Sequence, residues 1–241
     1  RDHTERMLRG FGYSVSCENG VISVAGGGVL RGTEIDIPAD ISSAAFFMVG
    51  ASIAPGSDLI LEHVGLNPTR DGVITILRAM GANIEVSQAR TVGGEPVADL
   101  RIRYAPLRGI DIPVEEVPLA IDELPAILVA AACAEGVTVL RGAEELRVKE
   151  SDRIASMAEG LTQLGIGNTV APDGITVVGG TPSGGVITTH HDHRIAMSFA
   201  MAALRASDPI IVTDCAHVAT SFPGFAELAA NTGLRLTVTA S

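Results

Sequence analysis

Residues 122–165 read DELPAILVAAACAEGVTVLRGAEELRVKESDRIASMAEGLTQLG, which predicts an apolar helix, a short strand and an amphipathic helix. Asp122 stands before the apolar run, where its carboxylate would accept hydrogen bonds from the free backbone N–H groups of a helix start. Four apolar residues of the second helix recur at helical spacing: Ile154, Met157, Leu161 and Leu164. This spacing indicates one buried face. Gly165 supplies the left-handed conformation that commonly follows a helix.

Two more stretches follow the same plan, at residues 40–81 and 192–233. Each has an aspartate before an apolar helix, then a β-type run, then a second helix that ends at a glycine. The β-type runs of the three copies are DLILEHV, VTVLRGA and PIIVTDC. The aspartate and the glycine are 41, 43 and 41 residues apart in the three copies. Self-similarity of this kind predicts stacked structural units.

Strand pairs follow the glycine in the first two copies. ANIEVSQ (82–88) is expected to pair with ADLRIRY (98–104), and residues 167–180 contain Asp173-Gly174, a strong hairpin turn signal. The repeating unit is therefore βαβαββ-like. It predicts an α/β (α+β) fold in which helices pack under sheets.

The first residues of the chain resemble only the second half of a unit. Gly12 follows Asp2 by ten residues, as Gly81 follows Asp71. We interpret residues 1–38 as the last half-repeat of an N-terminal domain.

Residues 39–241 are interpreted as a C-terminal domain of three repeats, with DIPAD (36–40) as the crossing between the domains. The third repeat has one closing strand, LRLTVTA (234–240), where the other two have a pair. We expect the N-terminal half of the same protein to be a partner of this chain and to supply the missing strand.

Composition bounds the class of protein. The chain has 241 residues, of which 46% are hydrophobic, and this is ample for a large core. Its net charge of −11 argues against nucleic-acid binding. The longest apolar run, residues 126–133, is far shorter than the ~20 residues that a membrane span needs. Three widely separated cysteines are expected to be buried reduced thiols of a cytoplasmic protein: Cys17, Cys133 and Cys215.

The segment RVKESDR (147–153) concentrates charge at the start of the second helix of the middle repeat. Charge of this density is most often a solvated helix face. The alternative is a binding site for an anionic substrate. Either Ser151 or Asp152 is expected to cap the helix.

Arginines in the first turns of two helices favour the binding site. Arg153 begins one helix, and Arg194 follows Asp192, the predicted cap of another. Helix N-termini attract anions, so a cation there does not stabilise the helix. It does suit the binding of a planar carboxylate or a phosphate through paired N–H donors.

Six motifs in this order resemble those of the 5-enolpyruvylshikimate-3-phosphate (EPSP) synthases, or 3-phosphoshikimate 1-carboxyvinyltransferases: ISSAAFFMV, NPTR, AIDELP, LRVKESDR, HDHRIAMSF and ATSFPGF. The opening RDHTE resembles the class II bacterial forms, which include glyphosate-tolerant members. The resemblance runs along the whole chain but covers only the C-terminal part of a family member. It implies an inverse α/β barrel in a two-domain enzyme.

The resemblance also implies the reaction. The enolpyruvyl group of phosphoenolpyruvate is transferred to the 5-hydroxyl of shikimate 3-phosphate by addition and elimination, with release of phosphate, in aromatic amino acid biosynthesis. No metal and no organic cofactor are implied. Asp122 would take the proton of the 5-hydroxyl, Lys149 would bridge the same hydroxyl, and Glu150 would protonate the enolpyruvyl methylene.

Binding roles follow from the same resemblance. Arg153 and Arg194, with Glu150, would bind phosphoenolpyruvate, and Arg1 would reach the 3-phosphate of the substrate that Asp122 and Lys149 also contact. Two positions depart from the family pattern: some members have a lysine at the place of Thr220, and some have an asparagine at that of Glu145. Most phosphate-binding residues of the family lie in the N-terminal half, so the chain alone is expected to have little catalysis.

Several other interpretations stay open. HHDHR (190–194) is a weak candidate for a metal site, because adjacent residues lack the spacing that helical metal ligands use. NPTR (67–70) is either a loop beside the cleft or the start of a helix. For the whole chain, enolpyruvyl transfer to a UDP-sugar and a non-catalytic βα-repeat binding module remain alternatives.

Overall fold

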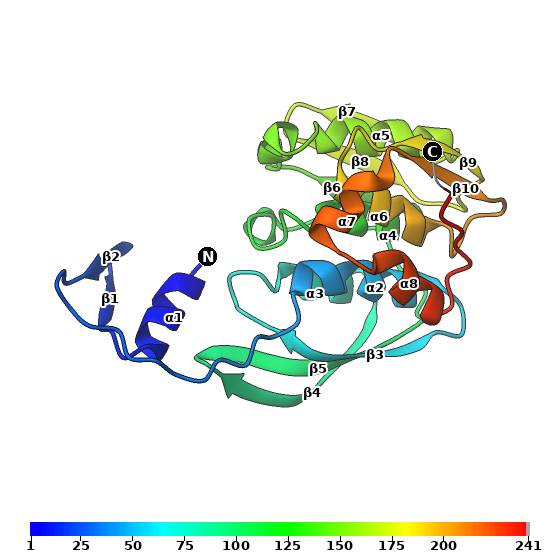
Figure 1. The fold of residues 1–241 in the computed structure, drawn as a ribbon. Coiled ribbons are helices and arrows are strands. Elements are labelled where there is room, and N and C mark those ends of the chain that lie inside the picture. The colour runs from blue at the N-terminus through cyan, green and yellow to red at the C-terminus, as the bar shows by residue number, and fades with distance from the viewer. Residues whose placement is uncertain (240–241) are drawn as a thin grey trace.

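A computed structural model describes residues 1–239 of the chain (Figure 1). The helices are α1 (His3–Gly10), α2 (Ile41–Ile53), α3 (Gly72–Ala79), α4 (Leu124–Ala132), α5 (Arg153–Gln163), α6 (His193–Ala202), α7 (Val218–Ser221) and α8 (Phe225–Asn231), with short 3-10 turns η1 (Val114–Glu116), η2 (Glu144–Val148) and η3 (Cys215–His217). The strands are β1 (Val15–Glu18), β2 (Val21–Val24), β3 (Asp58–Gly65), β4 (Asn83–Val92), β5 (Glu95–Arg103), β6 (Val137–Leu140), β7 (Asn168–Ala171), β8 (Gly174–Val178), β9 (Gly185–Thr188) and β10 (Ile210–Thr213). Within residues 1–239, no helix has the length and apolar character to cross a membrane.

The first helices of the three repeats, α2, α4 and α6, pack against one another at the centre of the fold. Every residue of α4 is buried, and all but one residue of α2 are buried. A helix that is apolar on all sides can be stable only where other elements cover it completely. Sheets and second helices provide that cover, so helices lie inside and sheets outside, as the inverse-barrel expectation requires.

Two three-stranded antiparallel sheets have the same strand order, β3-β5-β4 and β6-β8-β7. This confirms both predicted strand pairs. The leading strand of the repeat is reduced in these copies to isolated parallel bridges, such as that of Ala39 with Val64 and that of Asp111 with Val139. In the third copy it is a full strand, because β9 pairs in parallel with β10 over four residues. The βαβαββ plan is therefore present in the chain.

The glycines that close the three repeats have the predicted backbone. Gly81, Gly165 and Gly233 have φ values of +97°, +74° and +107°, respectively. The buried face of α5 is also confirmed, since the four residues at helical spacing are each no more than 1% exposed: Ile154, Met157, Leu161 and Leu164.

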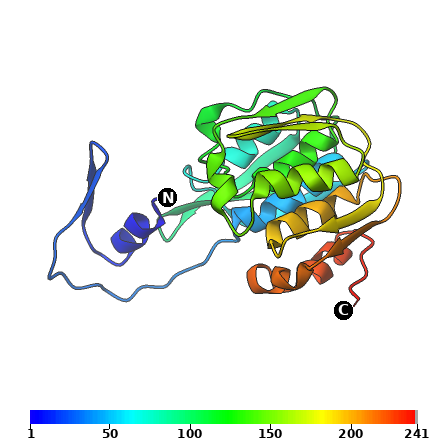
Figure 2. The same cartoon turned by 90° about the horizontal axis from the view of Figure 1, so that it is seen from above.

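The first 24 residues form a helix and an antiparallel hairpin, α1-β1-β2. This unit lies to one side of the three-repeat body, where α1 touches the tip of the β4–β5 hairpin, and an extended segment also joins the two (Figure 2). The predicted closing strand 234–240 is not formed: residues 234–239 contain no strand, and Ala240 lies outside the described residues. Without a neighbour to pair with, this segment has no sheet to extend.

Two further expectations are corrected. Asp122 does not cap α4, because the chain makes one more turn and Glu123 takes the position before Leu124. Cys17 and Cys215 are exposed rather than buried, and only Cys133 is largely covered. Burial raises the pKa of the Cys133 thiol to about 12.

Helices α5 and α6 approach closely at one glycine. A Cβ atom on Gly160 would lie 2.2 Å from the nearest ring carbon of Phe199, whose side chain is fully buried. This crossing fixes how the two helices, and the charged residues at their starts, lie relative to each other.

We predict that Gly160→Ala lowers the free energy of unfolding in urea. Overpacking a filled core costs about 1–3 kcal/mol, whereas alanine gains up to ~1 kcal/mol of helix propensity over glycine. The substitution should cost less in a Phe199→Leu background, where the ring is gone. A Gly160→Ala chain as stable as the unaltered one would show that the crossing is looser than described.

Candidate active site

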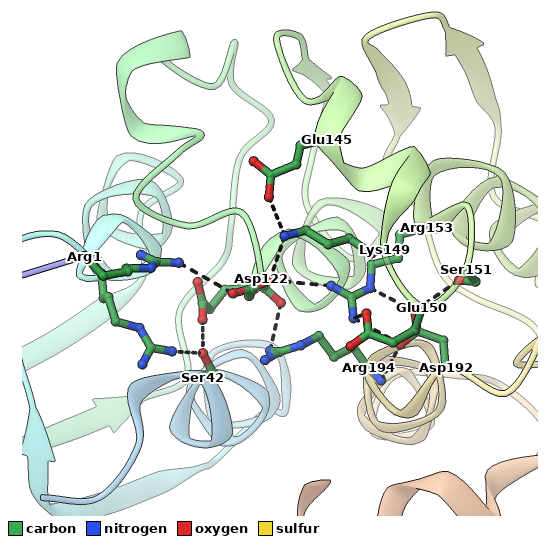
Figure 3. A network of polar contacts seen from close by, with 12 residues as sticks. Arg1, Ser42, Asp122, Glu145, Lys149, Glu150, Ser151, Arg153, Asp192 and Arg194 are labelled. Carbon is green, nitrogen blue, oxygen red and sulfur yellow. Dashed lines mark hydrogen bonds and ion pairs between the residues drawn. The ribbon is translucent and has the colours of Figure 1, made fainter. Parts of the chain in front are cut away.

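The N-terminal ends of four helices meet in one place (Figure 3). Ser42 comes from the first turn of α2, Asp122 precedes α4, Arg153 begins α5, and Asp192 and Arg194 stand at the start of α6. The parallel packing of the inner helices brings these ends together. The result is a cluster of polar and charged side chains that come from distant parts of the sequence, from Ser42 to Arg194.

Arg153 lies at the centre of this cluster and is 1% exposed. Its Nε donates to Asp192 Oδ2 at 2.8 Å, and its Nη2 pairs with Glu150 at 2.5 Å. Its Nη1 lies 3.6 Å from Asp122 Oδ1 and has no hydrogen-bond partner within the described residues. Within the described residues, Nη1 is therefore the part of this buried guanidinium that makes no hydrogen bond, although it faces the Asp122 carboxylate.

Asp192 caps α6 and holds Arg153 at the same time. Its Oδ1 accepts from the backbone N–H of Arg194 at 2.9 Å, and Ser151 Oγ donates to its Oδ2 at 3.1 Å. Burial alone would raise the pKa of the Asp192 carboxyl, but the hydrogen bond and charge of Arg153 hold it below its ordinary value. The cap predicted at Asp192 is therefore confirmed, and the second cap lies at Asp152, which accepts from Ala155 N.

Asp122 is surrounded by cations. Arg1 Nη2 lies 3.5 Å from Oδ2, Lys149 Nζ lies 3.7 Å from Oδ1, and Arg194 Nη1 donates to the backbone carbonyl at 3.0 Å. Burial alone would raise the pKa of the Asp122 carboxyl, but these three cations and Arg153 together hold it below its ordinary value. All six residues proposed from the sequence therefore lie in one cluster.

Lys149 and Glu150 differ from the buried arginine in their exposure. The side chain of Glu150 is 51% exposed, so its carboxyl can meet a ligand from the open side of the cluster. Lys149 Nζ pairs with Glu145 as well as approaching Asp122. Glu145 thus contacts a candidate site residue, although it is not among the site residues predicted from the sequence.

A second buried network of hydrogen bonds lies beside Asp122, and it was not predicted from the sequence. Glu123 is 1% exposed, and its Oε1 accepts from Ser42 Oγ. Ser42 Oγ in turn accepts from Arg70 Nη2, and Arg70 also pairs with Asp40 at 3.2 Å. Burial raises the pKa of the Glu123 carboxyl. In the sequence, Glu123 is visible only as the second of two acids before an apolar helix. The cap predicted at Asp122 is enough to explain acids at this place.

The remaining candidates lie outside this cluster. Thr220 Oγ1 donates to the His217 carbonyl at 2.7 Å. His190 pairs with Glu159 at 2.9 Å, and the His191 ring lies against that of His217. Over residues 1–239, no three His, Cys, Asp or Glu side chains gather in a way that could hold a metal ion.

Comparisons with known proteins agree on one family. The sequence model described as EPSP synthase (3-phosphoshikimate 1-carboxyvinyltransferase) matches residues 1–228. Proteins named 3-phosphoshikimate 1-carboxyvinyltransferase from Alkalilimnicola ehrlichii and Methylococcus capsulatus are 66% and 64% identical to the chain over 238 residues. These alignments cover 98% and 99% of the chain but 53% and 54% of the two relatives. The chain therefore spans about half the length of the curated relatives that it matches.

Solved structures give the same result for the fold. A 2.37 Å structure of EPSP synthase from Acinetobacter baumannii has a TM-score of 0.97 and 57% identity, covering 100% of this chain and 56% of that one. The enolpyruvyl transferase NikO from Streptomyces tendae has a TM-score of 0.73 at 19% identity, over 97% of this chain and 53% of that one. The second likeness concerns the fold alone.

We predict that Asp192→Asn lowers the free energy of unfolding at pH 7 by about 3–5 kcal/mol, because it leaves the buried Arg153 charge without its main partner. The pKa of Asp192 is lowered by folding. Its stabilising contribution is therefore present above about pH 4 and is lost as the pH falls through the folded pKa. The difference from the unaltered chain should shrink accordingly in acid.

Urea unfolding from pH 7 to pH 3 measures this dependence. Asp58→Asn is the matched control, because Asp58 pairs with Arg101 on the surface and both side chains are 43% exposed. That exposed pair should matter little at any pH. Equal effects of the two substitutions would contradict the role given to Asp192.

Proposed function

Because the chain belongs to the EPSP synthase (3-phosphoshikimate 1-carboxyvinyltransferase) family, we propose that it carries the C-terminal part of the machinery for enolpyruvyl transfer from phosphoenolpyruvate to shikimate 3-phosphate. The observation that carries this proposal is the position of Asp122 among four cations, with Glu150 beside them. Two anionic substrates and two proton transfers require such a set of groups.

Two arginines are proposed to bind phosphoenolpyruvate. Arg153 Nη1 makes no hydrogen bond within residues 1–239, and Arg194 reaches the same place from the start of α6. The N-termini of α5 and α6 add their free N–H groups and the positive ends of their dipoles. A carboxylate placed here would complete the hydrogen bonding of Arg153, which the protein alone leaves incomplete.

Proton transfer is assigned to the two carboxyl groups. The 5-hydroxyl oxygen of the acceptor adds to C2 of phosphoenolpyruvate as its proton passes to Asp122, and Glu150 gives a proton to C3. The tetrahedral adduct then loses phosphate by breaking the bond from C2 to the phosphate oxygen. The departing phosphate takes the proton held by Asp122, the methyl group returns a proton to Glu150, and the enolpyruvyl ether is formed. Lys149 is proposed to hold the 5-hydroxyl beside Asp122.

Substrate binding would itself adjust Asp122. A carboxylate with a lowered pKa is a weak base, and four cations lower the pKa of Asp122 in the unliganded protein. When anionic substrates neutralise Arg153, Arg194 and Arg1, their effect on Asp122 diminishes and its basicity rises. The base would then be strongest only when both substrates are present.

The N-terminal half of the enzyme is proposed as the partner of this chain, with residues 1–38 completing its domain and residues 39–241 forming most of the other. Large apolar side chains of the first segment lie uncovered, each at least 46% exposed: Val21, Ile22, Val24, Val29, Leu30, Ile35 and Ile37. Exposed apolar groups on this scale are typical of an interaction surface.

The edge of β10 supports the same partner. In the first two repeats, the strand equivalent to β10 has an antiparallel neighbour, β5 or β8. Within the described residues β10 pairs only with β9. A strand from the N-terminal half would fill the vacant place in this third sheet.

We predict that phosphate is released from phosphoenolpyruvate and shikimate 3-phosphate when the chain is mixed with the matching N-terminal half, and not by the chain alone. Glu150→Gln should lower kcat of the mixture by about 10²- to 10⁴-fold, the usual contribution of general acid–base catalysis. Glu144→Gln, also exposed and on the same segment but not part of the charged cluster, is the matched control and should leave kcat unchanged.

Complex formation is checked in the same samples by amide hydrogen exchange. Exchange of residues 210–213 should slow when the N-terminal half is added, while that of β3, already paired within its sheet, should not change. A folded complex without phosphate release would contradict the proposed reaction. Full activity of the chain alone would contradict the proposed partner.

A further inference from the structure

Asn67, between β3 and α3, is 2% exposed and uses its whole side chain to join three segments. Its Oδ1 accepts from the N–H of Thr69 at 2.8 Å and from Thr69 Oγ1 at 2.7 Å. Its Nδ2 donates to Asp2 Oδ1 at 2.6 Å and to Glu95 Oε2 at 2.9 Å. An asparagine side chain has two donor hydrogens and two acceptor lone pairs, and all four are used here.

Further contacts enclose this point. His3 Nδ1 lies 2.8 Å from Glu95 Oε1, and Arg6 Nε donates to Asp2 Oδ2 at 2.9 Å. We call the five residues Asp2, His3, Arg6, Asn67 and Glu95 the Asn67 junction. It fastens the start of α1 to the tip of the β4–β5 hairpin and to the loop that leads into α3. Residues 67–70 therefore lie outside α3 and lead into it, since the helix begins at Gly72.

The junction determines where Arg1 lies. Arg1 is bonded to Asp2, and its Nη1 donates to the carbonyl of Thr69 at 2.5 Å. Asn67 thus holds Asp2, which is next to Arg1 in the chain. It also holds Thr69, whose carbonyl accepts from the Arg1 guanidinium. The other end of that guanidinium, Nη2, lies 3.5 Å from Asp122. The Arg1 side chain is 33% exposed, so without these anchors it would sample many rotamers.

We propose that Asn67 is a positioning residue that holds Arg1 beside Asp122, so that Arg1 can bind the phosphate of the acceptor substrate. This inference rests on the proposed function but concerns a residue whose donors and acceptors are all taken up by other protein groups. It also connects the α1 unit to the charged cluster, because the junction is where α1 meets the three-repeat body (Figure 1).

The chemistry of the junction demands an amide at position 67. Two carboxylates, those of Asp2 and Glu95, face the same Nδ2 group. Replacing that group with an oxygen, as in Asn67→Asp, would bring three carboxyl groups together and turn two hydrogen bonds into repulsions. The fold of the three-repeat body would be affected little, because its core lies elsewhere.

The test compares Asn67→Asp with Asn83→Asp, a matched change at an exposed position of β4, in the chain combined with its N-terminal half. Asn67→Asp should raise KM for shikimate 3-phosphate by roughly 10- to 100-fold, the scale expected when a binding group is misplaced by about 1 Å. KM for phosphoenolpyruvate should stay unchanged. Amide exchange of residues 1–10 should become faster. Asn83→Asp should do none of this.

A rescue separates positioning from general damage. In the double variant Asn67→Asp with Asp2→Asn, the amide and the carboxylate exchange places. The new amide at position 2 can then donate to the new carboxylate at position 67, while its oxygen still accepts from Arg6. Part of the lost affinity for shikimate 3-phosphate should return. If Asn67→Asp prevents folding, Glu95→Gln serves as the milder variant, with a smaller effect in the same direction.

The outcomes keep this proposal distinct from the proposed function. Two results for Asn67→Asp would overturn the positioning role. One is faster amide exchange at residues 1–10 with an unchanged KM for shikimate 3-phosphate. The other is unchanged amide exchange at residues 1–10. If the unaltered complex binds shikimate 3-phosphate without turnover, the proposed reaction fails. In that case the Kd of the same variants for shikimate 3-phosphate, measured by calorimetry, takes the place of KM in testing the positioning role of Asn67. If it neither binds nor reacts, both proposals fail.

Discussion

The burial of one charged side chain constrains the whole site. Removing the Arg153 guanidinium from water is costly unless anions surround it, and Asp192, Glu150 and Asp122 lie around it at 2.5–3.6 Å. Asp192 belongs to α6, Glu150 to the segment before α5, and Asp122 to the turn before α4. The arginine therefore fixes three helix starts relative to one another. The close crossing of α5 and α6 at Gly160 sets the same geometry from the apolar side.

The apolar core supplies the platform on which these charges are placed. Because α4 is buried throughout and α2 and α6 are buried over most of their length, parallel packing gathers their three N-terminal ends at one point. Cations there face free N–H groups and do not stabilise the helices. In the proposed function, bound anionic substrates would face these cations, and this links the arrangement of the fold to the proposed chemistry.

The order of helices and strands could be predicted from the sequence. A pattern that recurs three times identifies elements that a single copy would leave ambiguous. Aspartate, apolar helix, strand and glycine recur three times, so the repeat and its closing glycines were placed correctly. Local errors arose where tertiary contacts compete with propensity. Glu123 took the place before α4 that was given to Asp122, and Cys17 and Cys215 lie exposed on elements that other parts of the chain do not cover.

The contacts between distant segments could not be read from the sequence. Nothing in NPTR shows that Asn67 reaches Asp2 and Glu95, since these residues are 65 and 28 positions away and no periodicity connects them. The same holds for Ser42 and Glu123, 81 positions apart. Both groups are buried polar networks, and such networks depend on the arrangement of whole elements rather than on local pattern.

The central claim is that four cations lower the pKa of the Asp122 carboxyl until anionic substrates neutralise them. The most direct measurement is a pH titration of the Asp122 carboxyl by ¹³C NMR in the complex with the N-terminal half, assigned with Asp122→Asn. The account predicts a pKa below the ordinary value of aspartate without ligand, and a rise when phosphoenolpyruvate binds. A pKa that starts at the ordinary value, or that does not rise with phosphoenolpyruvate, would contradict it.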